Sequence, residues 1–131
     1  MNKKKTLNVV LKAEDLAAFT LKTASNEKNF PKRYRFTITN KIVDKAFEIY
    51  TLIYEANELF PHNATELEVR QNKQRMAIAY CRSMQSMIDI AYNAFPISSK
   101  TVEIWTGKIF DVRNLTVAWL NRDRSRFAGK F

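Results

Sequence analysis

Three Phe-Pro pairs, Phe30-Pro31, Phe60-Pro61 and Phe95-Pro96, divide the 131-residue chain into four segments of similar length. Proline interrupts a helix interior but is tolerated in the first helical turn, and it disfavours helical geometry in the residue before it. Each pair therefore marks a boundary between structural elements. Because 131 residues is the size of one domain, we expect a single domain over residues 1–131 that contains four elements.

Within the four segments, apolar residues recur at alternating spacings of three and four, which is typical of amphipathic helices. The predicted helices cover residues 13–28, 32–60, 64–94 and 99–126. Asn63 and either Ser98 or Ser99 precede the last two helices, and these residue types are favoured N-caps.

The connections between the predicted helices are only a few residues long, which forces consecutive helices to run antiparallel. The chain also has only two glycines, Gly107 and Gly129, whereas the tight turns of an all-β fold usually use many. The sequence therefore predicts an all-α fold, an antiparallel up-down-up-down four-helix bundle.

The periodicity also predicts which face of each helix is buried. The second helix has two adjacent apolar seams, so it must bury more than one face, either at a central position in the bundle or at a subunit interface. Its first seam comprises Phe36, Thr39, Val43, Ala46, Tyr50, Ile53, Asn57 and Phe60. The third helix has a seam of Val69, Lys73, Met76, Tyr80, Ser83, Met87, Ile90 and Ala94. The fourth has a seam of Val102, Trp105, Ile109, Val112, Thr116 and Trp119.

The residues needed for catalysis are scarce. His62, the single histidine, falls in a loop, and Cys81, the single cysteine, falls in the middle of the third helix, where we expect a buried structural thiol. The Cys and His content is too low for a zinc site, and there is no Glu-x-x-His metal motif or phosphate-binding glycine loop. We therefore expect no enzymatic activity, metal or cofactor. The unpaired cysteine and the absence of an apolar membrane-spanning stretch predict a cytoplasmic protein that does not enter a membrane.

The formal net charge is +9, which predicts an anionic partner, most often nucleic acid. In an antiparallel bundle, the start of the second helix lies at one end of the molecule, while the start of the third and the end of the fourth lie at the other. Basic residues cluster at both ends. The predicted binding residues at the first end are Lys32, Arg33 and Arg35. Those at the opposite end are Arg70, Lys73, Arg75, Arg122, Arg124 and Arg126.

The stretch from Phe30 to Ile38 resembles the accessory variability determinant (Avd) proteins of diversity-generating retroelements, which belong with the four-helix-bundle proteins encoded in ribosomal-RNA intervening sequences. That family typically has a Phe-Pro pair, a basic residue and then Arg-Phe-Thr-Leu at the start of the second helix. Here Arg35-Phe36-Thr37-Ile38 matches the last four positions. Trp119, followed by Arg122 to Arg126, matches the family's late tryptophan and basic C-terminal residues.

The resemblance implies a non-catalytic partner of a reverse transcriptase. Such a protein would form a homopentamer with a basic surface and would bind the enzyme together with template RNA or RNA–DNA hybrid during mutagenic retrohoming. The residues by themselves leave two alternatives open. One is a module that binds only protein, such as a free-standing intervening-sequence protein, and the other is a nuclease or toxin, for which the sequence offers no acid–base pair.

Overall fold

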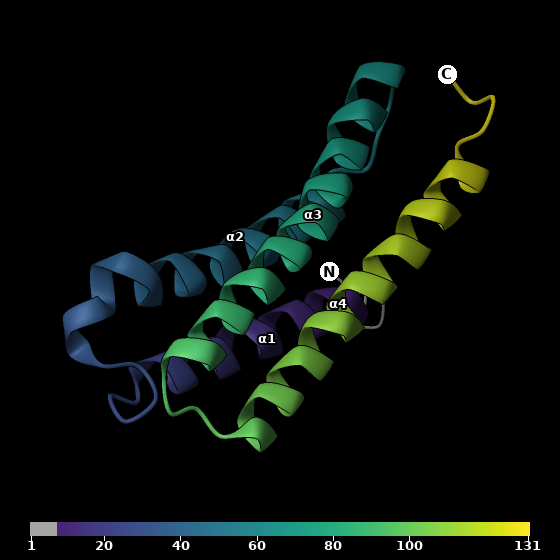
Figure 1. Ribbon diagram of the computed structural model, residues 1–131. Helices are drawn as coiled ribbons and strands as arrows, with labels where there is room; N and C mark the ends of the chain where they lie inside the picture. The colour runs from purple at the N-terminus through teal and green to yellow at the C-terminus, as the bar shows by residue number, and fades with distance from the viewer. Residues whose placement is uncertain (1–7) are drawn as a thin grey trace.

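The computed structural model describes residues 8–131, and that part of the chain is helical with no strand. The four helices are α1 (Asn8–Ser25), α2 (Asn40–Glu58), α3 (Ala64–Ala94) and α4 (Ser99–Arg126). Each helix packs against the next, and α4 also packs against α1. The fold is therefore the predicted antiparallel four-helix bundle (Figure 1). Residues 1–7 of the predicted single domain lie outside the described range.

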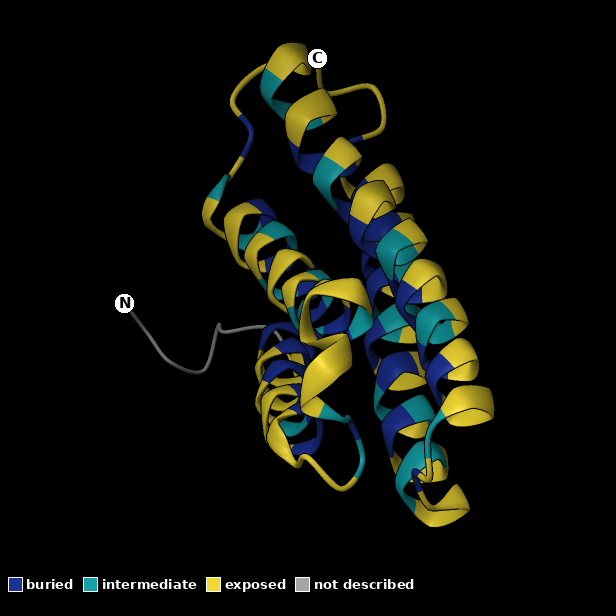
Figure 2. Cartoon of the chain, turned by 60° about the vertical axis from the view of Figure 1, so that its left-hand side comes forward, coloured by how far each residue is buried: buried dark blue, intermediate teal, exposed yellow. Residues whose placement is uncertain are grey.

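The helices differ in length, and this difference shapes one end of the molecule. α1 and α2 contain 18 and 19 residues, whereas α3 and α4 contain 31 and 28. At 1.5 Å per residue, α3 and α4 are about 15 Å longer than the other pair. The hairpin of α3 and α4 consequently extends past the end of α2, as Figures 1 and 2 show.

The predicted limits of the last two helices are confirmed, whereas those of the first two differ from the structure. α1 begins five residues before the predicted start and ends three residues before the predicted end. The predicted helix over residues 32–60 is divided: a 3₁₀ turn (Lys32–Tyr34) and a π-helical turn (Arg35–Thr39) lead into α2, which ends at Glu58. All three prolines lie in connections between helices, as expected.

The two predicted N-caps form in the structure. The Asn63 side chain accepts a hydrogen bond from the backbone N–H of Glu66 (2.8 Å), and Ser98 accepts one from Thr101 (3.1 Å). The Glu66 carboxylate accepts a hydrogen bond from the backbone N–H of His62 (2.7 Å). These local contacts fix the starts of α3 and α4, because they satisfy N–H groups that have no partner within the helix.

The core lies between the helices, and Figure 2 shows the buried residues of each helix in dark blue. The predicted seam of α4 is confirmed: Trp105 and Trp119 are buried, and Trp105 Nε1 donates to Thr20 Oγ1 of α1 (2.9 Å). The predicted seam of α3 is wrong by one residue, or roughly 100° around the helix axis. Its buried positions are Arg70, Gln71, Gln74, Ala77, Cys81, Met84, Ile88 and Ala91.

The seam predicted for the second helix is correct at its centre and wrong at both ends, because its last residue, Phe60, is half exposed. Thr39, Ala46 and Ile53 are buried, but Phe36 is 84% exposed. In the π-helical turn, the N–H of Asn40 bonds to the carbonyl of Arg35, five residues back. This wider turn holds one residue more than an α-helical turn, so Phe36 is displaced from the line of buried side chains.

Candidate nucleic-acid interface

The structure confirms the predicted sorting of the helix ends. At one end, the ring of Phe95 lies 5.7 Å from that of Phe30 and 5.3 Å from that of Tyr34. At the other end, Phe60 lies 5.9 Å from Phe127 (ring centroids). The first turn of the second helical segment therefore lies at one end of the bundle, and the start of α3 lies beside the end of α4 at the other. The nine predicted binding residues occupy these two ends.

Arg70 is the exception among the nine, because it is buried (4% exposed) rather than on the surface. Its Nε donates to Asp123 Oδ2 (2.7 Å), and its Nη2 donates to Asp123 Oδ1 (3.2 Å), so the pair is bidentate. Gln74 Nε2 also donates to Asp123 Oδ2 (2.8 Å). The guanidinium lies 5.1 Å above the Trp119 ring. The prediction that Arg70 offers its charge to a partner is corrected here: the charge is neutralised inside the bundle.

Arg70 also completes the end of α2. Its Nη1 donates to the backbone carbonyls of Ala56 (3.3 Å) and Leu59 (3.0 Å). The last carbonyls of a helix have no partner within it, and a basic side chain can satisfy them. A single side chain therefore ties α2 to α3 and, through Asp123, to α4.

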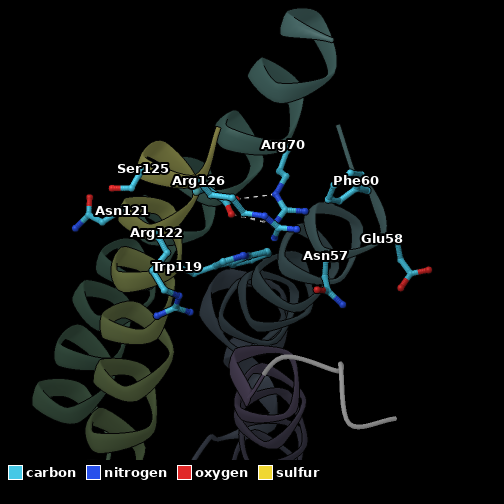
Figure 3. A pocket seen from close by; sticks show the side chains of 10 residues that line it. Asn57, Glu58, Phe60, Arg70, Trp119, Asn121, Arg122, Ser125 and Arg126 are labelled. Carbon is cyan, nitrogen blue, oxygen red and sulfur yellow. Dashed lines mark hydrogen bonds and ion pairs between the residues drawn. The ribbon is translucent and has the colours of Figure 1, made fainter. Parts of the chain in front are cut away.

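A cleft of about 1000 Å³ opens above this buried pair, between the end of α2 and the end of α4 (Figure 3). Its lining includes Asn57, Phe60, Trp119, Arg122, Ser125 and Arg126, with Arg70 and Asp123 also among its residues. The cleft exists because α2 ends short of the hairpin formed by α3 and α4. Amide and hydroxyl groups, cations and one exposed carboxylate, that of Glu58, thus line a hollow that is large enough for a segment of a polymer.

Arg122, Arg124 and Arg126 are exposed on the last turns of α4, and none of them forms an ion pair with another described residue. The Arg126 guanidinium lies 5.2 Å from the Phe60 ring centroid and 5.1 Å from that of Phe127. Such contacts hold a guanidinium in place while leaving its N–H edge free for a phosphate. Arg122 and Arg126 are about one helical turn apart and both line the cleft, whereas Arg124 is not among the lining residues.

Of the two α3 cations also predicted from the sequence, Lys73 is paired with an acid, whereas Arg75 contacts only a neutral amide and keeps its charge free. Lys73 Nζ pairs with Glu55 Oε1 (3.0 Å), and Arg75 Nη1 donates to Asn72 Oδ1 (2.7 Å) on the exposed surface of α3. At the opposite end of the bundle, Lys32, Arg33 and Arg35 are all exposed. Arg35 lies 3.5 Å from Glu27, and both side chains are largely solvated, so this pair is weak.

Sequence reasoning missed Asp123, the acid that holds Arg70. Asp123 continues the predicted seam of α4 by one step, four residues after Trp119, and it stands between Arg122 and Arg124. A lone acid on the buried face of an arginine-rich segment requires a cation opposite it. Extending the seam would therefore have identified Asp123 as buried, although its partner lies 53 residues away in the sequence.

The residues considered for catalysis lie apart from this cleft or inside the core. The His62 side chain is exposed and contacts Glu66 (Nδ1 to Oε1, 3.2 Å). Cys81 is buried, as predicted. Within residues 8–131 there is no group of three or more His, Cys, Asp or Glu residues placed to hold a metal ion. None of the described helices is long and apolar enough to cross a bilayer.

Burial raises the pKa of the Cys81 thiol to about 12, and the nearby Arg113 guanidinium opposes this rise only in part. Because the thiolate is the reactive form, we expect Cys81 of the folded protein not to react with a disulfide reagent such as DTNB at pH 8. Unfolding in urea should make the thiol react in full. Fast, stoichiometric labelling of the folded protein would contradict the burial of this residue.

A scan against protein-family models gave no match, and neither did searches of curated proteins and of solved structures.

Proposed function

We propose that this protein is a non-catalytic, oligomeric accessory protein that binds template RNA or RNA–DNA hybrid together with a reverse transcriptase. The observation that carries the proposal is a group of three exposed arginines without ion pairs at the end of α4, Arg122, Arg124 and Arg126. Two of them, Arg122 and Arg126, line a cleft of about 1000 Å³. Guanidinium groups recognise phosphates through paired hydrogen bonds. The net charge of +9 would attract a polyanion from a distance.

The identity of the protein partner rests on the resemblance of residues 30–38 to Avd proteins, which bind a reverse transcriptase. The proposed oligomer, a homopentamer by the same resemblance, has support from an apolar strip along α2 and α3. Phe47, Tyr54, Val69 and Met76 are exposed large apolar residues on these helices. Part of this strip is the face of α3 that the sequence assigned to the core, and a second copy of the chain would bury it. Light scattering on the purified protein tests the oligomeric state.

The proposal predicts that RNA binding weakens steeply with salt and depends little on base sequence. Three phosphate contacts release their counterions with a slope of about −2 in a plot of log K against log salt for a single strand. We expect this slope or a steeper one when labelled RNA is titrated by fluorescence anisotropy at several salt concentrations. Absence of binding at low salt, or binding that salt does not change, would overturn the proposal.

A protein-only interaction module is the second candidate, and the same exposed apolar strip favours it. In that case, replacing Arg122, Arg124 and Arg126 with alanine would leave RNA binding unchanged and abolish binding to a protein partner. Measuring both interactions on one variant distinguishes the two functions, because the two candidates assign the arginines to different partners.

A further inference from the structure

Phe36 has the highest exposed fraction, 84%, of the large apolar side chains that the structure describes. It lies in the π-helical turn Arg35–Thr39, and residues 32–37 form a continuous exposed stretch that comes forward in Figure 2. The neighbours of Phe36 are anchored instead: Tyr34 packs against Phe95, and Ile38 packs against the core. Phe36 is therefore exposed between two anchored positions, Tyr34 and Ile38.

Three cations of the same segment are close to Phe36 in the sequence and are exposed with it. Lys32 and Arg33 precede Phe36 by four and three residues, in the 3₁₀ turn that leads into the π-helical turn. Both cations are exposed, and neither has an ion pair within residues 8–131. Arg35 is also exposed, and its pair with Glu27 is weak. We call Phe36 with Lys32, Arg33 and Arg35 the Phe36 platform.

A small pocket of about 230 Å³ adjoins the platform, between the end of α1 and the start of α2. Its polar lining comprises Ser25, Glu27, Lys32, Arg35, Thr39 and Asn40, and the remaining lining residues are apolar. Thr39 is more than nine-tenths buried, and its hydroxyl has no hydrogen-bond partner among the described residues. A buried hydroxyl without a partner is costly. The pocket has two cations, Lys32 and Arg35, and one acid, Glu27, so its net positive charge favours an anionic or polyhydroxylated group.

We propose that the Phe36 platform binds an unpaired nucleotide of a single-stranded nucleic acid, with the base stacked on Phe36 and its sugar–phosphate held by Lys32, Arg33 and Arg35. The pocket beside Thr39 would receive part of the sugar–phosphate. This inference rests on the proposed function and narrows it, because it specifies which form of nucleic acid this end of the bundle recognises.

Binding of a stacked nucleotide explains why an aromatic ring and cations are exposed together on the platform. Aromatic side chains beside a basic surface are the usual means of holding single strands, since every base has a face that can stack. In a duplex, the faces of the bases are already stacked on one another, so an aromatic side chain cannot stack on them. A protein surface would also be attracted to Phe36, but three cations with one weakly held acid favour a phosphate-rich ligand.

The test compares Phe36→Ala with the unchanged chain. We expect the variant to bind a short unstructured RNA about tenfold more weakly or worse, in the range that base–aromatic stacking contributes. Binding to the same RNA annealed to its complement should be unchanged. The salt dependence should also be unchanged, because stacking releases no counterions. Phe36→Trp should retain single-strand binding. Phe110→Ala, which removes an exposed aromatic residue from the middle of α4, is the matched control and should have no effect.

A second readout reports on the base itself. The fluorescence of 2-aminopurine placed in the RNA should be quenched by the unchanged chain and by Phe36→Trp, and not by Phe36→Ala. If the unchanged chain binds RNA and Phe36→Ala binds it equally well, the platform proposal is wrong and the proposed function stands. If the unchanged chain binds no RNA, the proposed function is wrong, and the platform proposal that rests on it is wrong as well. If Phe36→Ala loses only a protein partner, the platform is a protein-docking site and the proposal is overturned.

Discussion

Replacing Asp123 with alanine is expected to lower the free energy of unfolding by about 3–5 kcal/mol, the range found when one partner of a buried ion pair is removed. The substitution would leave the Arg70 guanidinium buried without its bidentate acceptor, and Gln74 Nε2 would lose its partner as well. Urea denaturation followed by circular dichroism measures this change, since the midpoint shifts in proportion to stability.

Two variants make this result specific. Asp111→Ala removes an acid from the exposed surface of the same helix and should change stability by less than about 0.5 kcal/mol. Replacing the pair together, with Arg70→Met and Asp123→Leu, should recover part of the loss, because it removes the buried unpaired charge. Recovery should be incomplete, because Gln74 Nε2 and the carbonyls of Ala56 and Leu59 still lose their partners. A change of less than about 1 kcal/mol for Asp123→Ala would mean that the pair is solvated, contrary to its burial.

Replacing Arg122, Arg124 and Arg126 together with alanine is expected to weaken RNA binding about 50-fold near physiological salt, and to reduce the salt slope by about 2. The three side chains are exposed, so the fold should be retained. Anisotropy titrations at several salt concentrations give both quantities. The slope separates a loss of phosphate contacts from a general loss of active protein, which would not change it.

The matched control for this variant is the replacement of Lys12, Lys22 and Lys100 with alanine. These lysines are exposed, have no ion pair among the described residues, and are scattered over α1 and the start of α4. The control therefore makes the same change in net charge away from the cleft. Equal losses in the two variants would show that net charge alone drives binding and that the end of α4 is not the contact surface.

Much of the fold was predictable because its signals are local. Proline is disfavoured in helix interiors, and the Asn63 and Ser98 side chains accept hydrogen bonds from N–H groups three residues further along the chain. The limits of α3 and α4 can therefore be predicted from short segments of sequence. The order of the helix ends followed from the short connections. The placement of basic residues at both ends of the bundle could therefore be predicted before any tertiary contact was known.

The buried face of α3 was not predictable in the same way. This helix has apolar residues on two sides, and Val69, Met76 and Ile90 on the outer side have the same periodicity as a core seam. The true core face begins instead with polar residues, Arg70 and Gln74. Periodicity records only that residues share a face, and the choice between two faces depends on which one α2 and α4 cover.

The sequence by itself therefore determined the number of helices, their antiparallel order, the caps of the last two helices and the two basic ends. Only the tertiary structure decided which charges are free and which aromatic side chain is exposed. Arg70 has the same chemistry as Arg122, yet it is neutralised by an acid 53 residues away. Phe36 has the spacing of a core residue, yet one wide turn places it in solvent. Both outcomes depend on contacts between distant residues or on backbone geometry, which the helix propensity and periodicity of a short segment do not determine.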